Sequence, residues 1–526
     1  GDRVAIGALF NGGTGTDAGH VRIYEYSNSS WTQLGSDIDG EAANDYSGWS
    51  VSMNSAGDRV AIGAERNDGT SSNTYYDAGH VRVYEYSNSG WTQLGSDIDG
   101  EGMENFSGES VSMNSAGDRV AIGADLNGDS GSEAGHVRVY EYSNSGWTQL
   151  GSDIDGEAAG DRSGWSVSMN SAGDRVAIGA ISNGATGSDA GHVRVYEYSN
   201  SSWTQLGSDI DGEAANDYSG WSVSMNSAGD RVAIGAYFND GSASNAGHVR
   251  IYEYSNSSWT QLGSDIDGEA AVDRSGTSVS MNSAGDRVAI GAIFNDGTAS
   301  QAGHVRVYEY NNSSWSQLGS DIDGEAADDR FGWSVSMNSA GDRLAIGGTD
   351  NDGTASDAGH VRIYEYSNSS WTQLGSDIDG EAAYDYSGNS VSMNSAGDRV
   401  AIGAPYNDGT ASYAGHVRVY SLAELFIDSQ QLLPDKFTLD QNYPNPFNPI
   451  TTLRYELPEN GLVNITIYDM VGRQVKTLVN QRQDAGYRSV VWDATNDNGK
   501  PVSAGIYLYQ IQAGGNMQTK KMVLLK

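Results

Sequence analysis

The phrase Gly-Asp-Arg-Val-Ala-Ile-Gly-Ala begins at Gly1 and returns, nearly unchanged, seven more times along the chain. The later copies begin at Gly57, Gly117, Gly173, Gly229, Gly285, Gly341 and Gly397. Six of the seven spacings are 56 residues and one is 60. Self-similarity at such a period indicates one supersecondary unit copied in tandem, so we expect the repeats to build a single body of about 420 residues.

One repeat reads as four short strands. Residues 163–169 and 191–198 alternate between polar and apolar side chains, and 175–180 and 203–206 add two further short strands. The turn Asn-Ser-Ala-Gly-Asp joins the first two strands and favours a tight hairpin. Four antiparallel strands per repeat, with no helical periodicity, predict an all-β fold, a β-propeller of four-stranded blades.

The number of blades follows from the number of strands of each kind. The chain carries eight second strands and eight third strands, but seven clear first strands and seven Trp-Thr/Ser-Gln-Leu strands. Eight blades would lack the inner strand of the first blade and a good outer strand in the last, where residues 422–427 would substitute. Seven blades would leave two strands unplaced. Eight blades are favoured, with seven as the alternative.

The sequence of the repeat is similar to that of a known family. Ser-Gly-Trp-Ser-Val-Ser, Gly-Asp-Arg-Val-Ala-Ile-Gly-Ala and Ala-Gly-His-Val-Arg-Val-Tyr resemble the FG-GAP repeat of integrin-α-type propellers over residues 1–420. Phe331-Gly332 and Gly403-Ala404-Pro405 match that pattern literally, whereas most copies have Ser-Gly and lack the proline. The resemblance implies a propeller, and integrin-like propellers have seven blades.

Composition divides the chain near residue 430. Residues 1–434 hold 20 Arg, no Lys and 61 acidic residues, a net charge of −41, whereas the remainder carries +2. We therefore expect a propeller over 1–428, a linker over 429–438 and a small immunoglobulin-like β-sandwich over 439–526. So acidic a body repels nucleic acid. No apolar run approaches the ~20 residues of a membrane span, so membrane insertion is not expected.

The tail closely resembles the type A C-terminal sorting domain of type IX secretion cargo, in the motifs at 442–448, 467–473, 504–507 and 521–526. The resemblance implies contact with the type IX machinery and a secreted or outer-surface location on a Gram-negative bacterium. It also implies a missing signal peptide, and since the chain opens within a repeat we expect a fragment or a trimmed product. The residues that carry the signal are Asn442, Pro444, Pro446, Phe447, Gly472, Arg473, Gly505, Tyr507, Lys521 and Lys526.

Two repeated residue types are predicted to be structural. All eight histidines open the third strand of a repeat, and seven tryptophans open the fourth. A catalytic histidine needs neighbours unlike those of its siblings, and equivalent positions do not provide them. We therefore interpret the histidines as packing residues between blades. The regular recurrence of the tryptophans gives the same interpretation, with sugar stacking by partly exposed rings as the alternative.

Differences between the copies point to a ligand-binding face. They gather in the loop between strands two and three and in the loop before strand one, which strand alternation places on one face of the disc. Binding residues usually lie on loops held by a rigid scaffold. The predicted ligand-binding residues are Trp49, Trp165, Trp221, Trp333, Tyr46, Tyr218 and Tyr386.

Each complete copy also carries an acidic loop, Asp-Ile-Asp-Gly-Glu followed by a further Asp. Paired carboxylates suit a hard cation such as Ca²⁺, although the spacing is not that of an EF-hand loop. Asp also serves in loops as a turn former. The predicted calcium ligands are Asp153, Asp155, Glu157, Asp161, Asp209, Asp211, Glu213 and Asp217.

These observations together predict a secreted or cell-surface, non-catalytic propeller that mediates adhesion or binds an extracellular glycan or protein at several points. The near-identity of the copies argues against the differently tuned carboxylates that an enzyme needs. Two alternatives stay open. One is a structural surface-coat module without a dedicated ligand, and the other is an extracellular polysaccharide hydrolase or lyase that uses carboxylates around the pore.

Overall fold

The computed structural model describes residues 3–12, 14–27, 30–68, 76–408, 415–421, 436–442, 444–458, 460–483 and 486–525. Across these residues the regular secondary structure consists of strands. The chain divides into two compact units, Gly1–Leu425 and Phe426–Lys526. The described residues contain no helix with the length and apolar character that crossing a bilayer requires.

The first unit forms eight sheets from its described residues, each built by one repeat, which agrees with the favoured prediction of eight blades. The inner strands are β5 (Ser50–Met53), β10 (Ser110–Met113), β15 (Ser163–Met169), β20 (Ser222–Met225), β25 (Ser275–Met281), β30 (Phe331–Met337) and β35 (Ser390–Met393). The second strands are β1 (Arg3–Ala8), β6 (Arg59–Ala64), β11 (Arg119–Ala124), β16 (Arg175–Ala180), β21 (Arg231–Ala236), β26 (Arg287–Ala292), β31 (Arg343–Gly348) and β36 (Arg399–Ala404).

The outer half of each blade follows the same plan. The third strands are β2 (His20–Ser27), β7 (His80–Ser87), β12 (His136–Ser143), β17 (His192–Ser199), β22 (His248–Ser255), β27 (His304–Asn311), β32 (His360–Ser367) and β37 (His416–Ser421). The fourth strands are β3 (Ser30–Gln33), β8 (Gly90–Gln93), β13 (Gly146–Gln149), β18 (Ser202–Gln205), β23 (Ser258–Gln261), β28 (Ser314–Gln317) and β33 (Ser370–Gln373). The substitute outer strand predicted at 422–427 lies outside the described residues.

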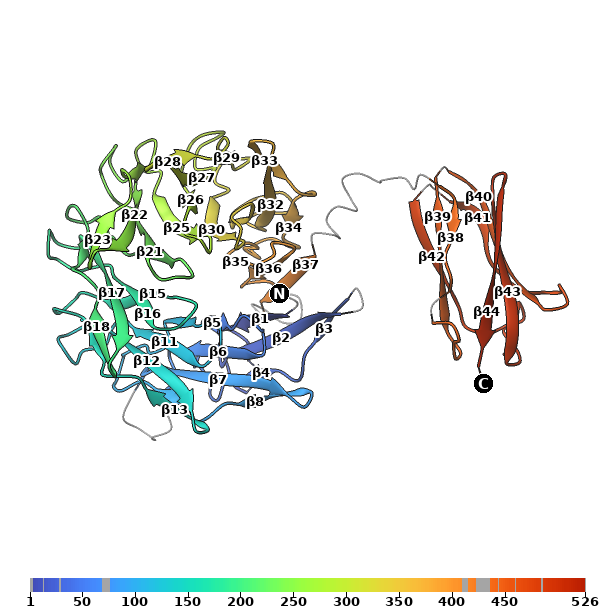
Figure 1. Ribbon diagram of the computed structural model, residues 1–526, viewed down its shortest axis with the longest axis horizontal. Coiled ribbons are helices and arrows are strands. Elements are labelled where there is room, and N and C mark those ends of the chain that lie inside the picture. Colours follow the sequence, from blue (N-terminus) through green and yellow to red (C-terminus); the bar gives the residue numbers. More distant parts are fainter. Residues whose placement is uncertain are drawn as a thin grey trace. The chain divides into compact units, whose positions relative to one another are not determined.

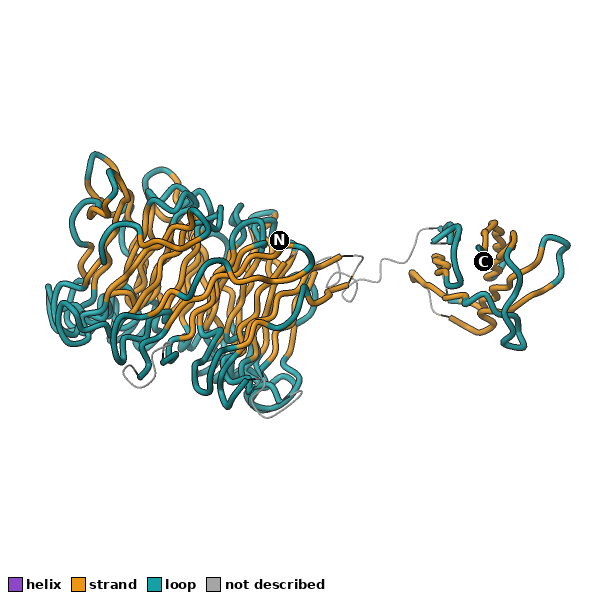
Figure 2. The backbone as a smooth tube through the Cα atoms, turned by 90° about the horizontal axis from the view of Figure 1, so that it is seen from below, coloured by secondary structure: helices purple, strands orange, loops and turns teal. Residues whose placement is uncertain are grey.

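The blades follow one another around a ring, and β1 of the first blade contacts β37 of the last (Figure 1). Inner strands of neighbouring blades contact each other, and all pairings within a blade are antiparallel. Seen from the side, the strands cross the disc and the loops gather on its two faces (Figure 2). The sequence period therefore becomes the angular period of a closed ring, as expected of a propeller.

A fifth, two-residue strand in seven of the blades was not predicted. These strands are β4 (Ile38–Asp39), β9 (Ile98–Asp99), β14 (Ile154–Asp155), β19 (Ile210–Asp211), β24 (Ile266–Asp267), β29 (Ile322–Asp323) and β34 (Ile378–Asp379). Each pairs with the third strand at its histidine end, as Asp211 does with His192. The cause is the buried isoleucine of the acidic loop, which packs in the core and draws that loop onto the sheet.

The core lies between neighbouring blades. At the junction of blades 4 and 5, Val193 and Val195 of β17 and Ile210 of β19 pack against Val232 and Ile234 of β21, all at most 3% exposed. Burying an aliphatic side chain of this size contributes about 1.5–3 kcal/mol. Because the same cluster recurs at other junctions, each blade depends on its neighbours for stability.

The invariant turn between strands one and two also joins the blades. In blade 4, Asn170 Oδ1 accepts hydrogen bonds from the backbone N–H groups of Asp174 and Arg175. The Arg175 guanidinium donates to Glu197 Oε1 in its own blade, at 2.7 Å, and to the Gly229 backbone oxygen of the next blade, at 3.1 Å. These structural contacts explain why this turn scarcely varies between copies.

Blade 1 has no inner strand among the described residues. Beside the free edge of β1 lies a cavity of about 620 Å³, lined by residues of β1, β5, β35, β36 and β37. At the complete junctions an inner-strand methionine donates its backbone N–H to the preceding inner strand, as Met225 does to Ser168 Oγ at 3.1 Å. Trp49 and Val51, which would face a strand in the cavity, are 44% and 37% exposed. The cavity therefore lies where a complete blade has its inner strand, beside an edge of β1 that has no partner strand among the described residues.

A peptide with the sequence of residues 163–172 is therefore expected to bind blade 1 in trans and to raise the midpoint of thermal unfolding. At a peptide concentration one hundredfold above Kd, the gain in unfolding free energy is about 2.7 kcal/mol. Differential scanning fluorimetry measures the shift, and the control peptide carries Asp in place of its Val and Met. An equal shift with both peptides, or none with either, contradicts strand binding in the cavity.

The second unit is a small β-sandwich. One sheet contains β38 (Thr438–Leu439), β39 (Thr451–Leu457) and β42 (Gly486–Trp492). The other contains β40 (Gly461–Asp469), β41 (Gln474–Gln483), β43 (Gly505–Ala513) and β44 (Asn516–Leu524). Trp492, Leu453, Ile465 and Tyr509 fill a single core between the sheets, each at 0% exposure. This agrees with the predicted immunoglobulin-like sandwich.

Most residues of the predicted sorting signal help to build this sandwich. Phe447 lies in the core, Asn442 Nδ2 donates to Thr451 Oγ1 at 2.9 Å, and the Tyr507 hydroxyl donates to the Ser503 backbone oxygen at 2.6 Å. The remaining described residues lie on β43 and β44, in the β40–β41 turn and before β39: Gly505, Lys521, Gly472, Arg473, Pro444 and Pro446. Lys526 lies outside the described residues. Their role in sorting stays a prediction.

Candidate functional site

The two loop types that vary between copies are hydrogen-bonded to each other. We call the loop between strands two and three the long loop, and the loop before each inner strand the lead-in loop. The lead-in loop of blade 5 donates from Tyr218 N to Asp189 O at 3.1 Å and from Ser219 N to Ala190 O at 2.9 Å, both in the long loop of blade 4. Because this pattern recurs around the ring, long and lead-in loops form one surface, the varied face.

One position of the lead-in loop holds a bulky residue in the left-handed region of φ. In the seven copies φ lies between +51° and +57° at Tyr46, Phe106, Arg162, Tyr218, Arg274, Arg330 and Tyr386. Such a conformation costs roughly 1–3 kcal/mol for a residue with a large side chain. Gly or Asn would adopt this backbone at lower cost, yet aromatic or cationic residues occupy it in every copy. Strain of this kind is concentrated at functional sites.

A row of aromatic rings crosses the varied face of blades 4 and 5. The Trp165 and Trp221 ring centroids are 4.9 Å apart, Trp221 and Tyr237 are 4.3 Å apart, and Tyr237 and Phe238 are 4.1 Å apart. Tyr218 joins the row at 5.6 Å from Phe238. All five side chains, which we call the aromatic row, are half-buried. Ring edges and faces therefore remain available to a ligand.

Exposed apolar side chains of the propeller gather on the same face. Seven of the eight large hydrophobic residues that are exposed in its described part lie on long loops, on lead-in loops or at the entrance of an inner strand: Trp49, Tyr76, Met103, Val272, Trp333, Tyr384 and Tyr406. The eighth, Val51, faces the blade 1 cavity. Exposed apolar groups confined to one face mark an interaction surface.

Four arginines are not repeated, and all four lie on the varied face. Sixteen of the 20 arginines in residues 1–434 occupy two repeated positions, which leaves Arg66, Arg162, Arg274 and Arg330. Each of the four contacts an aromatic ring, and the Arg274 guanidinium lies 4.6 Å from the centroids of both Phe238 and Phe294. Burial, together with the charge of Arg330, lowers the pKa of Arg274. Because residues 1–434 are so acidic, these four non-repeated arginines distinguish the varied face from the opposite face of the disc.

Three carboxyl groups converge at blades 2 and 3 in a way that no other copy repeats. Glu109 occupies a position that holds tryptophan in four of the other copies and hydrogen-bonds to Glu65, while Asp125 lies next to them. Burial, the hydrogen bond to Glu65 and the Glu65 charge raise the pKa of Glu109 to about 10. Burial raises the pKa of Asp125 to about 6, although Arg162 Nε lies 3.4 Å from its carboxylate. We call these residues the acid group.

The structure places the predicted ligand-binding residues on the varied face, but not in one site. Trp165, Trp221 and Tyr218 belong to the aromatic row. Tyr46 contacts Phe10, and Tyr386 contacts Tyr406, in the sector of blades 1, 2 and 8. Trp49 lines the blade 1 cavity and Trp333 stands apart in blade 7. A ligand role for all seven stays a prediction.

The repeated tryptophans and histidines occupy junctions between blades. The indole N–H of six of the seven tryptophans donates to a leucine backbone oxygen of the preceding blade, as Trp259 does to Leu206 at 2.6 Å. His192 is fully buried beside Glu157 of the preceding blade. Burial, together with the Arg194 charge, lowers the pKa of His192 to about 4. The predicted packing role agrees with these contacts.

The predicted calcium ligands separate into two kinds. Asp161 accepts hydrogen bonds from the Glu157 and Ala158 backbone and from Asn183, as a turn former does. In the next blade, Asp217 accepts from the Ala214 backbone and from Asn239. The other carboxylates flank buried histidines: Asp153 and Asp155 at His136, Glu157 and Asp209 at His192. The eight carboxylates therefore do not surround one point in each copy. Calcium binding stays a prediction.

Several residues of the varied face were not found by sequence reasoning. These are Phe10, Glu65, Arg66, Glu109, Asp125, Arg162, Tyr237, Phe238, Arg274, Phe294, Arg330 and Tyr406. The signal that could have found them is departure from the repeat, because each occupies a position where the copies disagree. Most of them lie in the two loop types whose variation was predicted to mark the binding face, but only aromatic residues were named there as ligands.

The comparisons with known proteins bear on the two units separately. The family of FlgD Ig-like domains matches residues 450–516, within the sandwich. No curated protein matches the chain. Among solved structures, a protein assigned as a 6-phosphogluconolactonase of Bacteroides uniformis is 11% identical, with a TM-score of 0.47, over 72% of this chain and 98% of that one. The periplasmic gluconolactonase PpgL of Pseudomonas aeruginosa is 9% identical, with a TM-score of 0.44, over 68% and 92%.

A third solved structure spans both units. PorZ of Porphyromonas gingivalis, a bacterial surface component of the type IX secretion system, is 12% identical, with a TM-score of 0.35, over 96% of this chain and 74% of that one. At such identities each likeness concerns the fold alone.

The prediction that the chain is not an enzyme was wrong. Two of the solved structures that it resembles carry lactonase names. That prediction rested on the near-identity of the copies. The copies are not identical at the acid group of Glu65, Glu109 and Asp125, which occurs at one position in the ring. The low identities transfer neither a reaction nor a substrate.

Proposed function

We propose that the chain is a surface-displayed propeller that binds an extracellular glycan across the varied face. The observation that carries the proposal is the aromatic row, in which Trp165, Trp221 and Tyr237 lie 4.3–4.9 Å apart and half-buried. Flat rings with free faces suit the C–H faces of sugar rings, while the Ser, Asn and Asp side chains of the loops offer hydrogen bonds to hydroxyl groups. The alternative is that the varied face binds a protein ligand.

The surface location rests on the tail. Its motifs resemble the type IX sorting domain, and the FlgD Ig-like family matches the same region. The net charge of −41 in residues 1–434 favours solubility and repels anionic surfaces. Export by the type IX machinery is part of the proposal.

Trp221→Ala is expected to weaken glycan binding at least tenfold, because it removes the central ring of the aromatic row and about 1.4 kcal/mol or more of contact. A glycan array identifies the polymers that the full chain retains, and isothermal titration measures their affinity. Trp333→Ala is the matched control, since Trp333 occupies the same position of the repeat in blade 7, outside the row. Equal losses in both variants, or no retained glycan, contradict the proposed site.

A second candidate function, hydrolysis of the bound polymer, is favoured by the acid group. At pH 7 a Glu109 whose pKa is raised to about 10 holds its proton, whereas an Asp125 whose pKa is raised to about 6 is mostly ionised. Carboxyl groups tuned apart in this way suit a general acid and a general base. Release of reducing ends by the wild type, lost in Glu109→Gln with binding retained, would support hydrolysis. Intact polymer after prolonged incubation would rule it out.

A further inference from the structure

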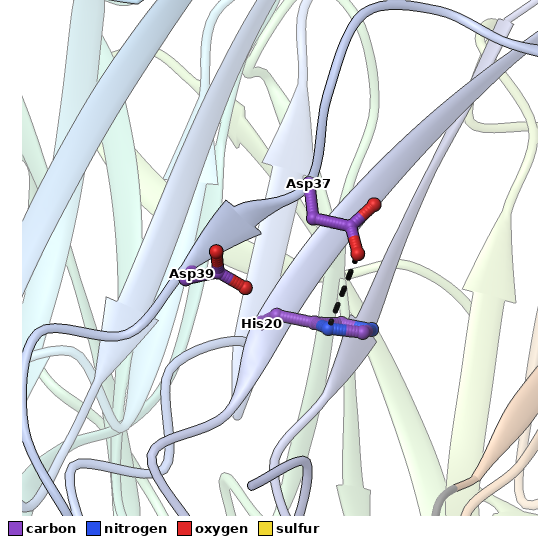
Figure 3. Close-up of side chains that lie close together, drawn as sticks. All are labelled: His20, Asp37 and Asp39. Carbon is purple, nitrogen blue, oxygen red and sulfur yellow. Dashed lines mark ion pairs between the residues drawn. The ribbon is translucent and has the colours of Figure 1, made fainter. Parts of the chain in front are cut away.

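At several junctions between blades, a buried histidine lies beside carboxylates from both blades. At the junction of blades 3 and 4, His192 Nδ1 lies 3.9 Å from Asp211 Oδ1 and 4.0 Å from Glu157 Oε2, and Asp209 belongs to the same group. Asp209 and Asp211 come from the acidic loop of blade 4, whereas Glu157 comes from that of blade 3. Figure 3 shows the corresponding group in blade 1, with His20 between Asp37 and Asp39.

The polar atoms of this group are not satisfied by hydrogen bonds. His192 is 0% exposed, and neither of its ring nitrogens has a hydrogen-bond partner among the described residues. Asp211 Oδ1 is also buried without such a partner there. Buried polar atoms are almost always paired, because an unpaired one costs roughly 1–3 kcal/mol. Separations of 3.9–4.0 Å are too long for direct hydrogen bonds.

The arrangement recurs around the ring. His80 Nδ1 lies 3.9 Å from Glu41 Oε2, and His248 Nδ1 lies 3.7 Å from Glu213 Oε2. His304 Nδ1 lies 3.9 Å from both Glu269 Oε2 and Asp323 Oδ1. In blades 2 to 7 the Nδ1 atom has no hydrogen-bond partner within the described part of the chain: His80, His136, His192, His248, His304 and His360. An unpaired nitrogen beside carboxylates is therefore a property of the repeat.

These separations fit a shared cation. Zn²⁺ binds histidine nitrogen and carboxylate oxygen at about 2.0–2.2 Å in tetrahedral geometry, which sets two ligands roughly 3.4 Å apart. The observed groups would need to contract by about half an ångström. Calcium takes six to eight oxygen ligands, whereas a histidine nitrogen with carboxylates is a donor set for zinc-like ions. Nitrogen in the group thus changes the class of metal that the sequence predicted.

We propose that the six junctions at which blades 2 to 7 each meet the preceding blade are binding sites for a Zn²⁺-class divalent cation, with one ion at each junction. The ligands are the histidine Nδ1, the two aspartates of the same blade and the glutamate of the preceding blade. Because the donors come from two blades, each ion links neighbouring blades of the ring. Among the described residues, blade 8 offers the pair His416 and Glu381, and blade 1 offers His20, Asp37 and Asp39, so both are weaker sites.

The Arg194 guanidinium lies beside the same group of side chains. Arg194 Nη1 lies 3.7 Å from Glu157 Oε1, the carboxylate oxygen other than the one nearest His192. The guanidinium thus orients the glutamate while its charge reduces the affinity for a cation.

The test is metal stoichiometry in the untagged full chain. After incubation with Zn²⁺ and removal of free metal at pH 7, elemental analysis is expected to find about six ions per chain. His192→Gln should lower the count by one, and the triple variant at His192, His248 and His304 should lower it by three. Co²⁺ in place of Zn²⁺ should give visible absorption bands of a nitrogen- and oxygen-ligated ion. The intensity of these bands should fall in proportion to the number of ions lost in each variant.

A second set of variants covers the case in which the histidine variants do not fold. Asp209→Asn with Asp211→Asn removes two carboxylates from partly exposed positions and leaves the histidine in place, and it should also lower the count by one. Gln205→Ala, at the side chain that donates to Asp209, is the control and should keep the full count. A count that does not change between wild type and the folded variants overturns the proposal, as does retention of less than one ion per chain.

Discussion

Glu109→Gln is expected to raise the free energy of unfolding by about 3 kcal/mol at pH 7. The pKa of Glu109 is raised to about 10 in the folded chain, chiefly by burial and also by Glu65, against an ordinary value of 4.5. Between pH 4.5 and pH 10 the folded state therefore holds a proton that the unfolded state has lost. The contribution of Glu109 to stability is greatest below pH 4.5 and falls by about 1.4 kcal/mol per pH unit between pH 4.5 and pH 10. Glutamine stays neutral and removes this loss.

The measurement is urea unfolding of both proteins between pH 5 and pH 9. The difference between them should grow with pH, because only the wild type must take up a proton to fold. Glu104→Gln, at an exposed glutamate of the same lead-in loop, is the control and should stay within about 0.5 kcal/mol of wild type. A constant difference across the pH range would show that Glu109 is not held protonated.

Gly235→Ala is expected to destabilise the propeller by about 3 kcal/mol or more. A Cβ on Gly235 would lie 2.2 Å from the Gly276 backbone oxygen of the next blade and 2.4 Å from Ser222 Oγ. The backbone oxygen cannot withdraw unless the two blades separate, and Ser222 Oγ already donates to it at 2.8 Å. The added methyl group therefore acts at the contact between blades 5 and 6.

Urea unfolding followed by tryptophan fluorescence measures this effect. Gly146→Ser is the matched control, because nothing lies within 4 Å of a Cβ there and the equivalent positions hold Ser202 and Ser258. The control should match wild type. If Gly235→Ala also unfolds within 1 kcal/mol of wild type, the blades do not pack as closely as the structure has them.

Much of the fold could be predicted because the same strand and turn signals occur in each of the eight copies of the repeat. The alternation of residues 191–198 and the invariant Asn-Ser-Ala-Gly-Asp turn are local signals that fix strand and hairpin without knowledge of distant contacts. The two-residue strand at Ile210–Asp211 was not predicted, because its isoleucine is the only apolar residue in a polar loop. Its burial depends on Val232 and Ile234 of the next blade, which the local sequence does not reveal.

The candidate site could be predicted only in part. Variation at one position of the repeat led to Trp165 and Trp221, which do meet in the structure. Arg274, by contrast, could not be predicted, because it contacts Phe238 and Phe294, which come from the long loops of two different blades. Glu65 and Glu109 are 44 positions apart and meet only when neighbouring blades are packed side by side. Contacts of this kind follow from ring closure and not from the sequence of one repeat.

The location of the ligand tests the account most directly. Hydrogen–deuterium exchange would be compared between the free chain and the chain saturated with the polymer that it retains on the array. The account predicts slower exchange in the long and lead-in loops of blades 4 and 5, around Trp221 and Tyr237, and unchanged exchange in the invariant turns such as 170–174. Protection of those turns with unaltered exchange in the varied loops would contradict it.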